Sequence, residues 1–136
     1  MLDNLAALGE ISIPKAVYGE VTENDLKGSN EVKHADWIKV VELKAHESVA
    51  FSSVLDAGEA EVIALAIKQN ADLILMDDLA GRRAATAYGF EVMGTLGLLK
   101  VMYRTGYIEN MKDVLDELQM HGFWMSTDLY NKMLND

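Results

Sequence analysis

The chain contains no cysteine and only one proline, and it has no long apolar run. The absence of cysteine excludes disulfides and thiolate metal sites, and it fits a reducing compartment. Without an apolar stretch of about 18 residues, no helix can span a membrane. The opening residues 1–4 lack the basic stretch of a signal peptide. We therefore expect a cytoplasmic protein with no membrane partner.

Basic residues are also scarce. The chain has 12 Lys and Arg against 22 Asp and Glu, which gives a net charge of -10. Proteins that hold nucleic acid through phosphate contacts usually have a basic face. Two interpretations stay open: the chain does not bind nucleic acid tightly by itself, or some of its acidic groups bind metal. Charge that only keeps a small protein soluble explains most of the excess.

Apolar residues make up 50% of the 136 residues. This length and composition predict a single domain over residues 1–136 with one core. Apolar patterns predict strands at 11–13, 37–43, 73–76 and 90–93. They predict helices at 14–26, 56–67, 81–88, 94–104, 111–118 and 129–134. The remaining segments are a short amphipathic start at 2–8, a loop at 27–30 and a connector at 45–55. Strands that alternate with helices imply right-handed crossovers and a mostly parallel sheet, so the predicted fold class is α/β.

Acidic residues lie at or near the predicted carboxyl ends of the strands, where such sheets carry their working sites. They are Glu20, Glu59, Asp77 and Asp78. Carboxylates that converge at one sheet edge repel each other unless a cation such as Mg²⁺ or Mn²⁺, which prefers oxygen ligands, compensates. A metal held in this way can acidify a bound water and stabilise charge on a phosphodiester. The pattern therefore indicates a metal-dependent nuclease site.

Each of these acids also has a purely structural interpretation. Asp56 and Glu59 have the D-x-x-E spacing of a capping box, in which Asp56 caps the helix and Glu59 reaches back. Asp77 or Asp78 can cap the helix that follows them, although two adjacent acids exceed what one cap needs. Glu20 lies in the middle of a predicted helix, where a solvated face is the default.

Two further residue types bear on function. Arg82 and Arg83 begin the helix after the acid pair, where they can contact phosphate or pair with nearby carboxylates. The three histidines, His34, His46 and His121, show no zinc-binding spacing, which argues against a zinc site.

Three segments taken together resemble the PIN-domain family. They are IPKAVYGEV at 13–21, LDAGEAEVIALA at 55–66 and LILMDDLAGRR at 73–83. The tail at 94–134 is similar to the same branch, a group related to VapC toxins and often left as a domain of unknown function. The resemblance implies that Glu20 is the second acid of the family, that Glu59 rather than Glu61 is the third, and that Asp77 and Asp78 are the last.

The resemblance also implies a fold and an activity. PIN domains are three-layer α/β/α sandwiches with a mostly parallel sheet, and they hydrolyse RNA with Mg²⁺ or Mn²⁺. Members often serve as the toxin of a toxin–antitoxin pair, held silent by an antitoxin protein. The fold expected for this chain is therefore a PIN-like sandwich.

The chain departs from the family pattern at its start. PIN domains usually open with an apolar strand that ends in Asp, and Asp3 is not a substitute because it lies in the segment that should follow that strand. We therefore expect an N-terminally truncated version of the fold. The strand is central in the family's sheet, so its loss leaves its neighbours about two spacings, roughly 9–10 Å, apart. Backbone groups left unpaired there cost about 1–3 kcal/mol each when buried.

Three outcomes are open for such a sheet. It can close up, another chain can lend an element and make a dimer or other homo-oligomer, or the reading frame can begin upstream of a fragment.

Two functions follow as hypotheses. The first is a PIN-type ribonuclease that cleaves single-stranded RNA, with Glu20, Glu59, Asp77 and Asp78 holding Mg²⁺ or Mn²⁺ and Arg82 and Arg83 binding substrate. Because one family acid is missing, we expect its activity to be weakened. The alternative is a catalytically degenerate PIN-like protein that acts in interaction or oligomerisation, within a homo-oligomer or a toxin–antitoxin complex.

Overall fold

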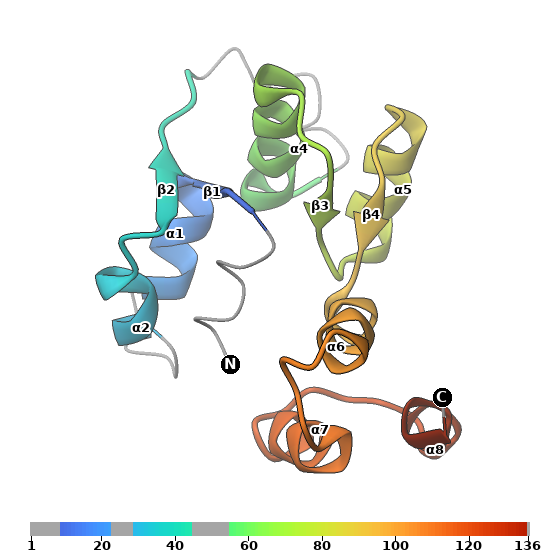
Figure 1. The fold of residues 1–136 in the computed structure, drawn as a ribbon. Helices are drawn as coiled ribbons and strands as arrows, with labels where there is room; N and C mark the ends of the chain where they lie inside the picture. Colours follow the sequence, from blue (N-terminus) through green and yellow to red (C-terminus); the bar gives the residue numbers. More distant parts are fainter. Residues whose placement is uncertain (1–8, 23–28, 45–54, 136) are drawn as a thin grey trace. The chain divides into compact units, whose positions relative to one another are not determined.

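The computed structural model describes residues 9–22, 29–44 and 55–135 (Figure 1). The predicted segment at 2–8, the end of the first predicted helix at 23–26 and most of the connector at 45–55 lie outside these residues. The contacts group into two compact units, one at 1–93 and one at 94–136. Each unit is described by itself below.

The first unit alternates strands with helices. Its elements are β1 (Ile11–Pro14), α1 (Lys15–Thr22), α2 (Ser29–His34), β2 (Ile38–Val41), α4 (Ala57–Gln69), β3 (Ile74–Leu75), α5 (Leu79–Ala87) and β4 (Val92–Met93). This order confirms the predicted α/β class, with the short parallel strands expected of a PIN-like α/β/α fold.

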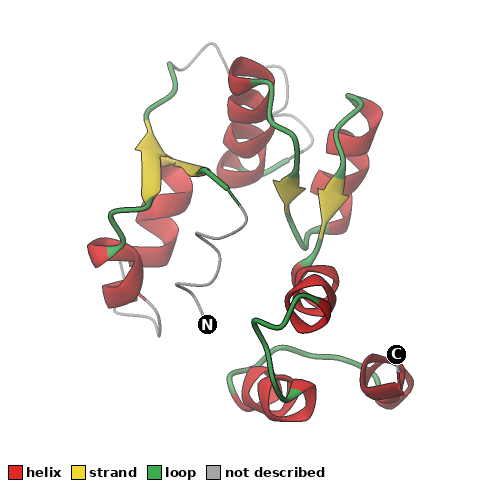
Figure 2. Ribbon diagram, in the orientation of Figure 1, coloured by secondary structure: helices red, strands yellow, loops and turns green. Residues whose placement is uncertain are grey.

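The described strands form two separate parallel pairs (Figure 2). In one pair Ile11 of β1 lies opposite Ile38 of β2, and in the other Ile74 of β3 lies opposite Val92 of β4. Within the described residues no ladder joins one pair to the other.

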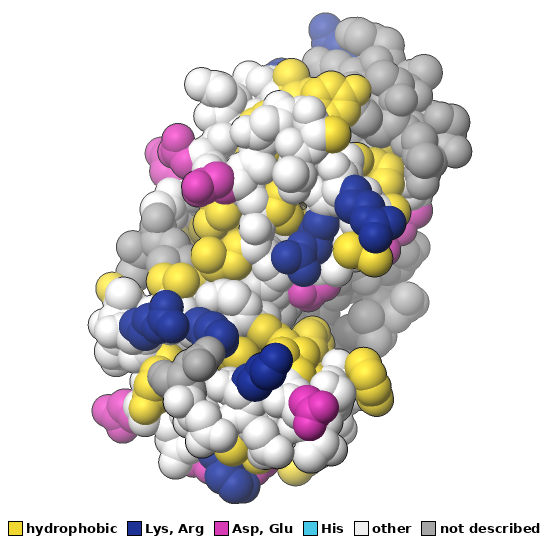
Figure 3. Space-filling view, turned by 90° about the vertical axis from the view of Figure 1, so that its right-hand side faces the viewer, with side chains coloured by type: hydrophobic (Ala, Val, Ile, Leu, Met, Phe, Trp, Pro, Cys, Tyr) yellow, Lys and Arg dark blue, Asp and Glu magenta, His cyan; other side chains and the backbone are white. Residues whose placement is uncertain are grey.

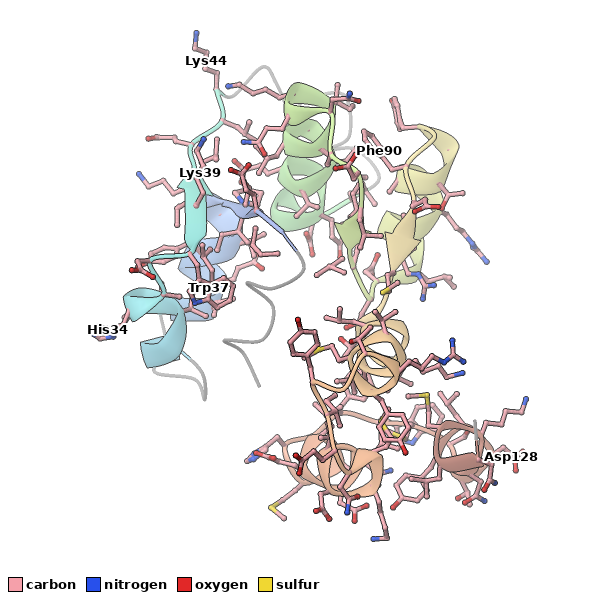
Figure 4. All side chains as sticks on the ribbon, in the orientation of Figure 1. His34, Trp37, Lys39, Lys44, Phe90 and Asp128 are labelled. Atoms are coloured by element: carbon pink, nitrogen blue, oxygen red, sulfur yellow. The ribbon has the colours of Figure 1, made fainter. Side chains whose placement is uncertain are left out.

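Helix α4 carries most of the core of this unit. It contacts both β1 and β3, and its Ile63 side chain is fully buried. Burying a side chain of this size contributes roughly 1.5–3 kcal/mol. Ala85 of α5 is also fully buried, and Phe90, labelled in Figure 4, packs against the same cluster. Residues 63–66 of this helix are buried, whereas Ile67 is 46% exposed.

Both ends of α4 are fixed by local chemistry. The Glu59 amide donates to Asp56 Oδ1 at 2.9 Å, and the Asp56 amide donates to Glu59 Oε2 at 3.3 Å. This confirms the capping box read from the sequence. At the other end Asn70 takes the left-handed conformation at φ 50°, and its amide donates back to the last turn.

The structure corrects the sequence prediction at α2 and at the strand ends. The loop predicted at 27–30 is wrong for Ser29 and Asn30, which open α2. A helix of six residues is marginal on its own. It is favoured here by contact with α1 and by Lys33 in its last turn, where positive charge suits the helix dipole. The predicted strands at 37–43, 73–76 and 90–93 are each shorter in the structure.

The second unit consists of α6 (Thr95–Arg104), α7 (Met111–Met120) and α8 (Thr127–Asn135). Leu99, Met102 and Leu115 are its most deeply buried side chains. Asn110 caps α7 by accepting from the Asp113 amide at 3.1 Å. Ser126 Oγ accepts from the Leu129 amide at 3.1 Å at the start of α8.

None of the helices in the described residues combines the length and the apolar character that crossing a bilayer requires.

Candidate functional site

Glu20 brings its carboxylate from α1 onto the first turn of α4. A methyl group built on Gly58 would lie 2.7 Å from Glu20 Oε1 and 3.2 Å from Cδ and Oε2. Gly58 is buried, while Glu20 as a whole is exposed. A carboxylate over the first turn of a helix interacts favourably with the helix dipole, by about 0.3–1 kcal/mol at exposed positions. Glu20 is therefore part of the α1–α4 contact rather than of a purely solvated face.

Glu59 follows Gly58 in the same turn and is half-buried. Desolvation raises the pKa of its carboxyl, and the negative charges of Asp56 and Asp78 raise it further. The hydrogen bond from the Asp56 amide acts in the opposite direction. The influence of Asp78 shows that the first turns of α4 and α5 bring two of the predicted acids within electrostatic reach of each other.

Asp77 and Asp78 follow β3, as predicted, and both are exposed. Asp78 is the N-cap of α5, because its Oδ2 accepts from the Gly81 amide at 2.8 Å. The capping role considered for this pair is therefore confirmed for Asp78. Asp78 Oδ1 lies outside this bond, so the cap leaves one carboxylate oxygen for other partners.

The acids present suit Mg²⁺ or Mn²⁺ in donor type, since carboxylate oxygens are the ligands that such hard ions prefer. Glu20 lies against the turn that carries Glu59. Across residues 9–22, 29–44 and 55–135, however, no group of three or more His, Asp or Glu side chains lies close enough to hold an ion. The four-carboxylate set therefore stays a prediction.

Arg82 and Arg83 both lie exposed on α5. The sequence of α5 thus presents two cations, and Figure 3, which views the molecule from the side of α5, shows Lys and Arg side chains at the surface. Among the described residues, no ion pair of Arg82 or Arg83 with a carboxylate is seen. Phosphate binding by these arginines stays a prediction.

Gly58 and Gly81 entered the sequence reasoning only as parts of the family resemblance, and no packing role was predicted for either glycine. A side chain at Gly58 would collide with Glu20, and one at Gly81 would collide with Met76 Sδ. The available signal was the position of each glycine in the first turn of a helix, where a glycine usually has a packing reason. The pattern could not reveal the packing partner, because Glu20 lies 38 positions away from Gly58 in the sequence.

Comparison with known proteins gives one finding. A family model described as a PIN domain matches residues 1–136. No curated protein matches the chain, and no solved structure does so either.

Proposed function

We propose a function on the premise that this chain belongs to the PIN-domain family: it is a divalent-metal-dependent ribonuclease that cleaves single-stranded RNA. Nuclease activity is the general property of this family. The observation that carries the proposal is the position of Glu20 against the first turn of α4, the turn that also carries Glu59. Glu20 lies against Gly58, and Glu59 lies within electrostatic reach of Asp78.

In this proposal Glu20, Glu59, Asp77 and Asp78 hold Mg²⁺ or Mn²⁺. When bound, the ion would supply an acidified water and stabilise charge on the phosphodiester. The chain itself positions the groups that react. The starts of α4 and α5 carry the carboxylates of Glu59 and Asp78. The exposed Arg82 and Arg83 on α5 offer guanidinium groups to the phosphates of the substrate.

The proposal extends to the partners of the protein and to its location in the cell. We infer that the protein works in the cytoplasm, where single-stranded RNA is available, as the toxin of a VapC-like toxin–antitoxin pair held by an antitoxin protein. We also infer a homo-oligomer, because the described strands form two separate pairs whose outer edges can accept strands from another copy. A single PIN domain over 1–136 is part of the same proposal, since the family match runs through both compact units.

The test is cleavage of single-stranded RNA with Mn²⁺, compared between the wild type, Asp78→Asn and Asp72→Asn. Asn caps helices as well as Asp does, so Asp78→Asn keeps the α5 cap and removes only the charge. Asp72 is an exposed acid before β3, at the other end of the same strand, and its replacement is a matched control.

We expect Asp78→Asn to lower the Mn²⁺-dependent rate at least about tenfold, the lower end of what disturbing a metal's surroundings costs. Asp72→Asn should cleave at the wild-type rate. Equal rates for all three proteins would reject the site assignment.

A second candidate is a catalytically degenerate PIN-like protein that acts in interaction or oligomerisation. It is favoured by the absence of a three-ligand group within the described residues and by the net charge of -10. Calorimetric titration with Mg²⁺ separates the two, because tight binding would count strongly against this candidate. No heat of binding, together with no RNA cleavage, would favour it.

A further inference from the structure

We infer that Gly58 is a positioning residue, which allows the Glu20 carboxylate to lie on the first turn of α4 beside Glu59. The inference deepens the proposed function and rests on it, because Glu20 and Glu59 are two of the proposed metal ligands. It assigns a role to a residue that has no functional group of its own.

The first step is the space between Gly58 and the Glu20 carboxylate. A methyl group at position 58 would lie 2.7 Å from Glu20 Oε1 and 3.2 Å from Cδ and Oε2. Real side-chain carbons essentially never come closer than 3.0 Å to such neighbours. Every residue other than glycine would therefore make the Glu20 carboxylate, which is the end of a flexible side chain, move from its present position on α4.

The second step excludes the other reasons for a glycine. The residues of the described chain with positive φ are Gly9, Asn70, Gly89, Gly106 and Gly122, so Gly58 does not need a left-handed backbone. Gly58 lies inside α4, where alanine is the better helix former. Neither backbone conformation nor helix propensity calls for glycine here, and the space occupied by the Glu20 carboxylate remains as the reason.

A second glycine supplies the contrast. Gly19 precedes Glu20 in α1 and also lies inside a helix, but a methyl group built on it would meet nothing within 4 Å. Replacement of Gly19 by alanine thus changes the helix without touching the carboxylate. The two glycines form a matched pair, one against Glu20 and one in open space.

The consequence concerns where the Glu20 carboxylate lies. Glu59 follows Gly58 in the first turn of α4. Glu20 comes from a different element, and its carboxylate reaches this turn only where α1 approaches α4 closely. Position 58 therefore decides whether the Glu20 carboxylate stays at the turn that carries Glu59.

The experiment measures Mn²⁺ affinity by electron paramagnetic resonance in the full chain, for the wild type, Gly58→Ala, Gly19→Ala and the double variant Gly58→Ala with Glu20→Asp. We expect Gly58→Ala to weaken binding about tenfold or more. Gly19→Ala should leave the affinity unchanged. The double variant should recover part of the loss, because aspartate is shorter by one methylene. Unchanged affinity in Gly58→Ala, or an equal loss in Gly19→Ala, would overturn the inference.

A second measurement separates this inference from the proposed function. Melting temperatures in metal-free buffer give a double-mutant cycle between Gly58→Ala and Glu20→Asp. If the wild type binds no Mn²⁺ but the two substitutions are strongly non-additive, the metal-dependent function fails and the placement of Glu20 by Gly58 stands. If their effects simply add, the positioning role is rejected whatever the metal result.

Discussion

Among single residues, Glu59 combines a useful bond with an unfavourable charge. Its carboxylate accepts the Asp56 amide and completes the capping box. The same carboxylate is partly desolvated and lies near the charges of Asp56 and Asp78, so its pKa is raised. A residue that only capped the helix would gain nothing from this environment, whereas a cation placed between Glu59 and Asp78 would relieve it.

Glu59→Gln tests this balance. Glutamine also serves at this position of a capping box, so the substitution keeps the bond and removes the charge. Because the folded-state pKa of Glu59 is raised above its ordinary value of 4.5, its contribution to stability is fully present below that pH and is lost as pH rises through the folded pKa. In metal-free buffer the variant should therefore melt like the wild type near pH 4 and at a higher temperature at pH 7.

The control for Glu59→Gln is Glu61→Gln, the same chemical change two residues further along α4. The thermal melts should show a pH-dependent gain for Glu59→Gln that exceeds any gain for Glu61→Gln. A gain of equal size in both variants would mean that the charge of the whole helix, rather than the neighbourhood of Asp56 and Asp78, sets the effect.

The sequence predicted these residue roles unevenly. The capping box was readable because both partners lie within one turn, and Asp78 was recognisable as a possible cap for the same reason. The contact between Glu20 and Gly58 was not readable, because it depends on how α1 packs on α4. Local patterns reveal bonds inside an element, and they do not reveal which atoms two elements bring together.

At the level of elements, periodicity located the helices well and the strands less well. Helix α7 matches the spacing of Met111, Val114, Leu115 and Leu118, which recurs at three and four residues. Strands β3 and β4 have only two residues each, because pairing rather than apolar composition sets their ends. Helix α2 was missed because its six residues depend on contact with α1 rather than on an apolar pattern of their own.

The connection between α7 and α8 gives a prediction at this level. Tyr130 of α8 donates from its hydroxyl to Asp116 Oδ1 of α7 at 2.6 Å, and Lys112 Nζ donates to Asp116 Oδ2 at 2.6 Å. The hydrogen bond to Asp116 raises the pKa of Tyr130, and the bonds from Lys112 and Tyr130 lower the pKa of Asp116. Lys112 is exposed, and Asp116 and Tyr130 are only half-buried, so we expect a measurable but small effect.

The pKa of Asp116 is lowered from 3.8, so its contribution to stability is present above that pH and is lost as pH falls through the folded pKa. The pKa of Tyr130 is raised from 10.0, so its contribution is present below pH 10.0 and is lost as pH rises through the folded pKa. Tyr130→Phe should therefore lower the melting temperature between these limits and have little effect beyond them. Tyr103→Phe, on an exposed tyrosine of α6, is the control and should change nothing.

For the whole molecule, charge is the property that most constrains function. A net charge of -10 repels RNA at long range, and this repulsion weakens beyond a Debye length of about 8 Å at physiological salt. The proposed RNA binding must therefore rest on local contacts, and Arg82 and Arg83 are exposed cations that follow Asp78 by four and five positions. The composition predicted the general repulsion, and the structure adds that these arginines form no ion pair with the described residues.

The salt dependence of RNA binding tests whether local contacts or net charge dominates. Each phosphate contact with a single strand contributes about -0.7 to the slope of log affinity against log salt, so two contacts contribute about -1.4. In metal-free buffer, fluorescence anisotropy with a labelled single-stranded RNA should give a slope shallower by about this amount for Arg82→Gln with Arg83→Gln, together with weaker binding.

The double variant Lys33→Gln with Lys39→Gln removes the same charge from α2 and β2 and should leave the slope unchanged. If both double variants lose affinity and slope alike, the field of the whole molecule governs binding and the arginines are not a substrate contact. If only the arginine variant loses affinity and slope, RNA contacts this acidic protein at the start of α5, beside its N-cap residue Asp78.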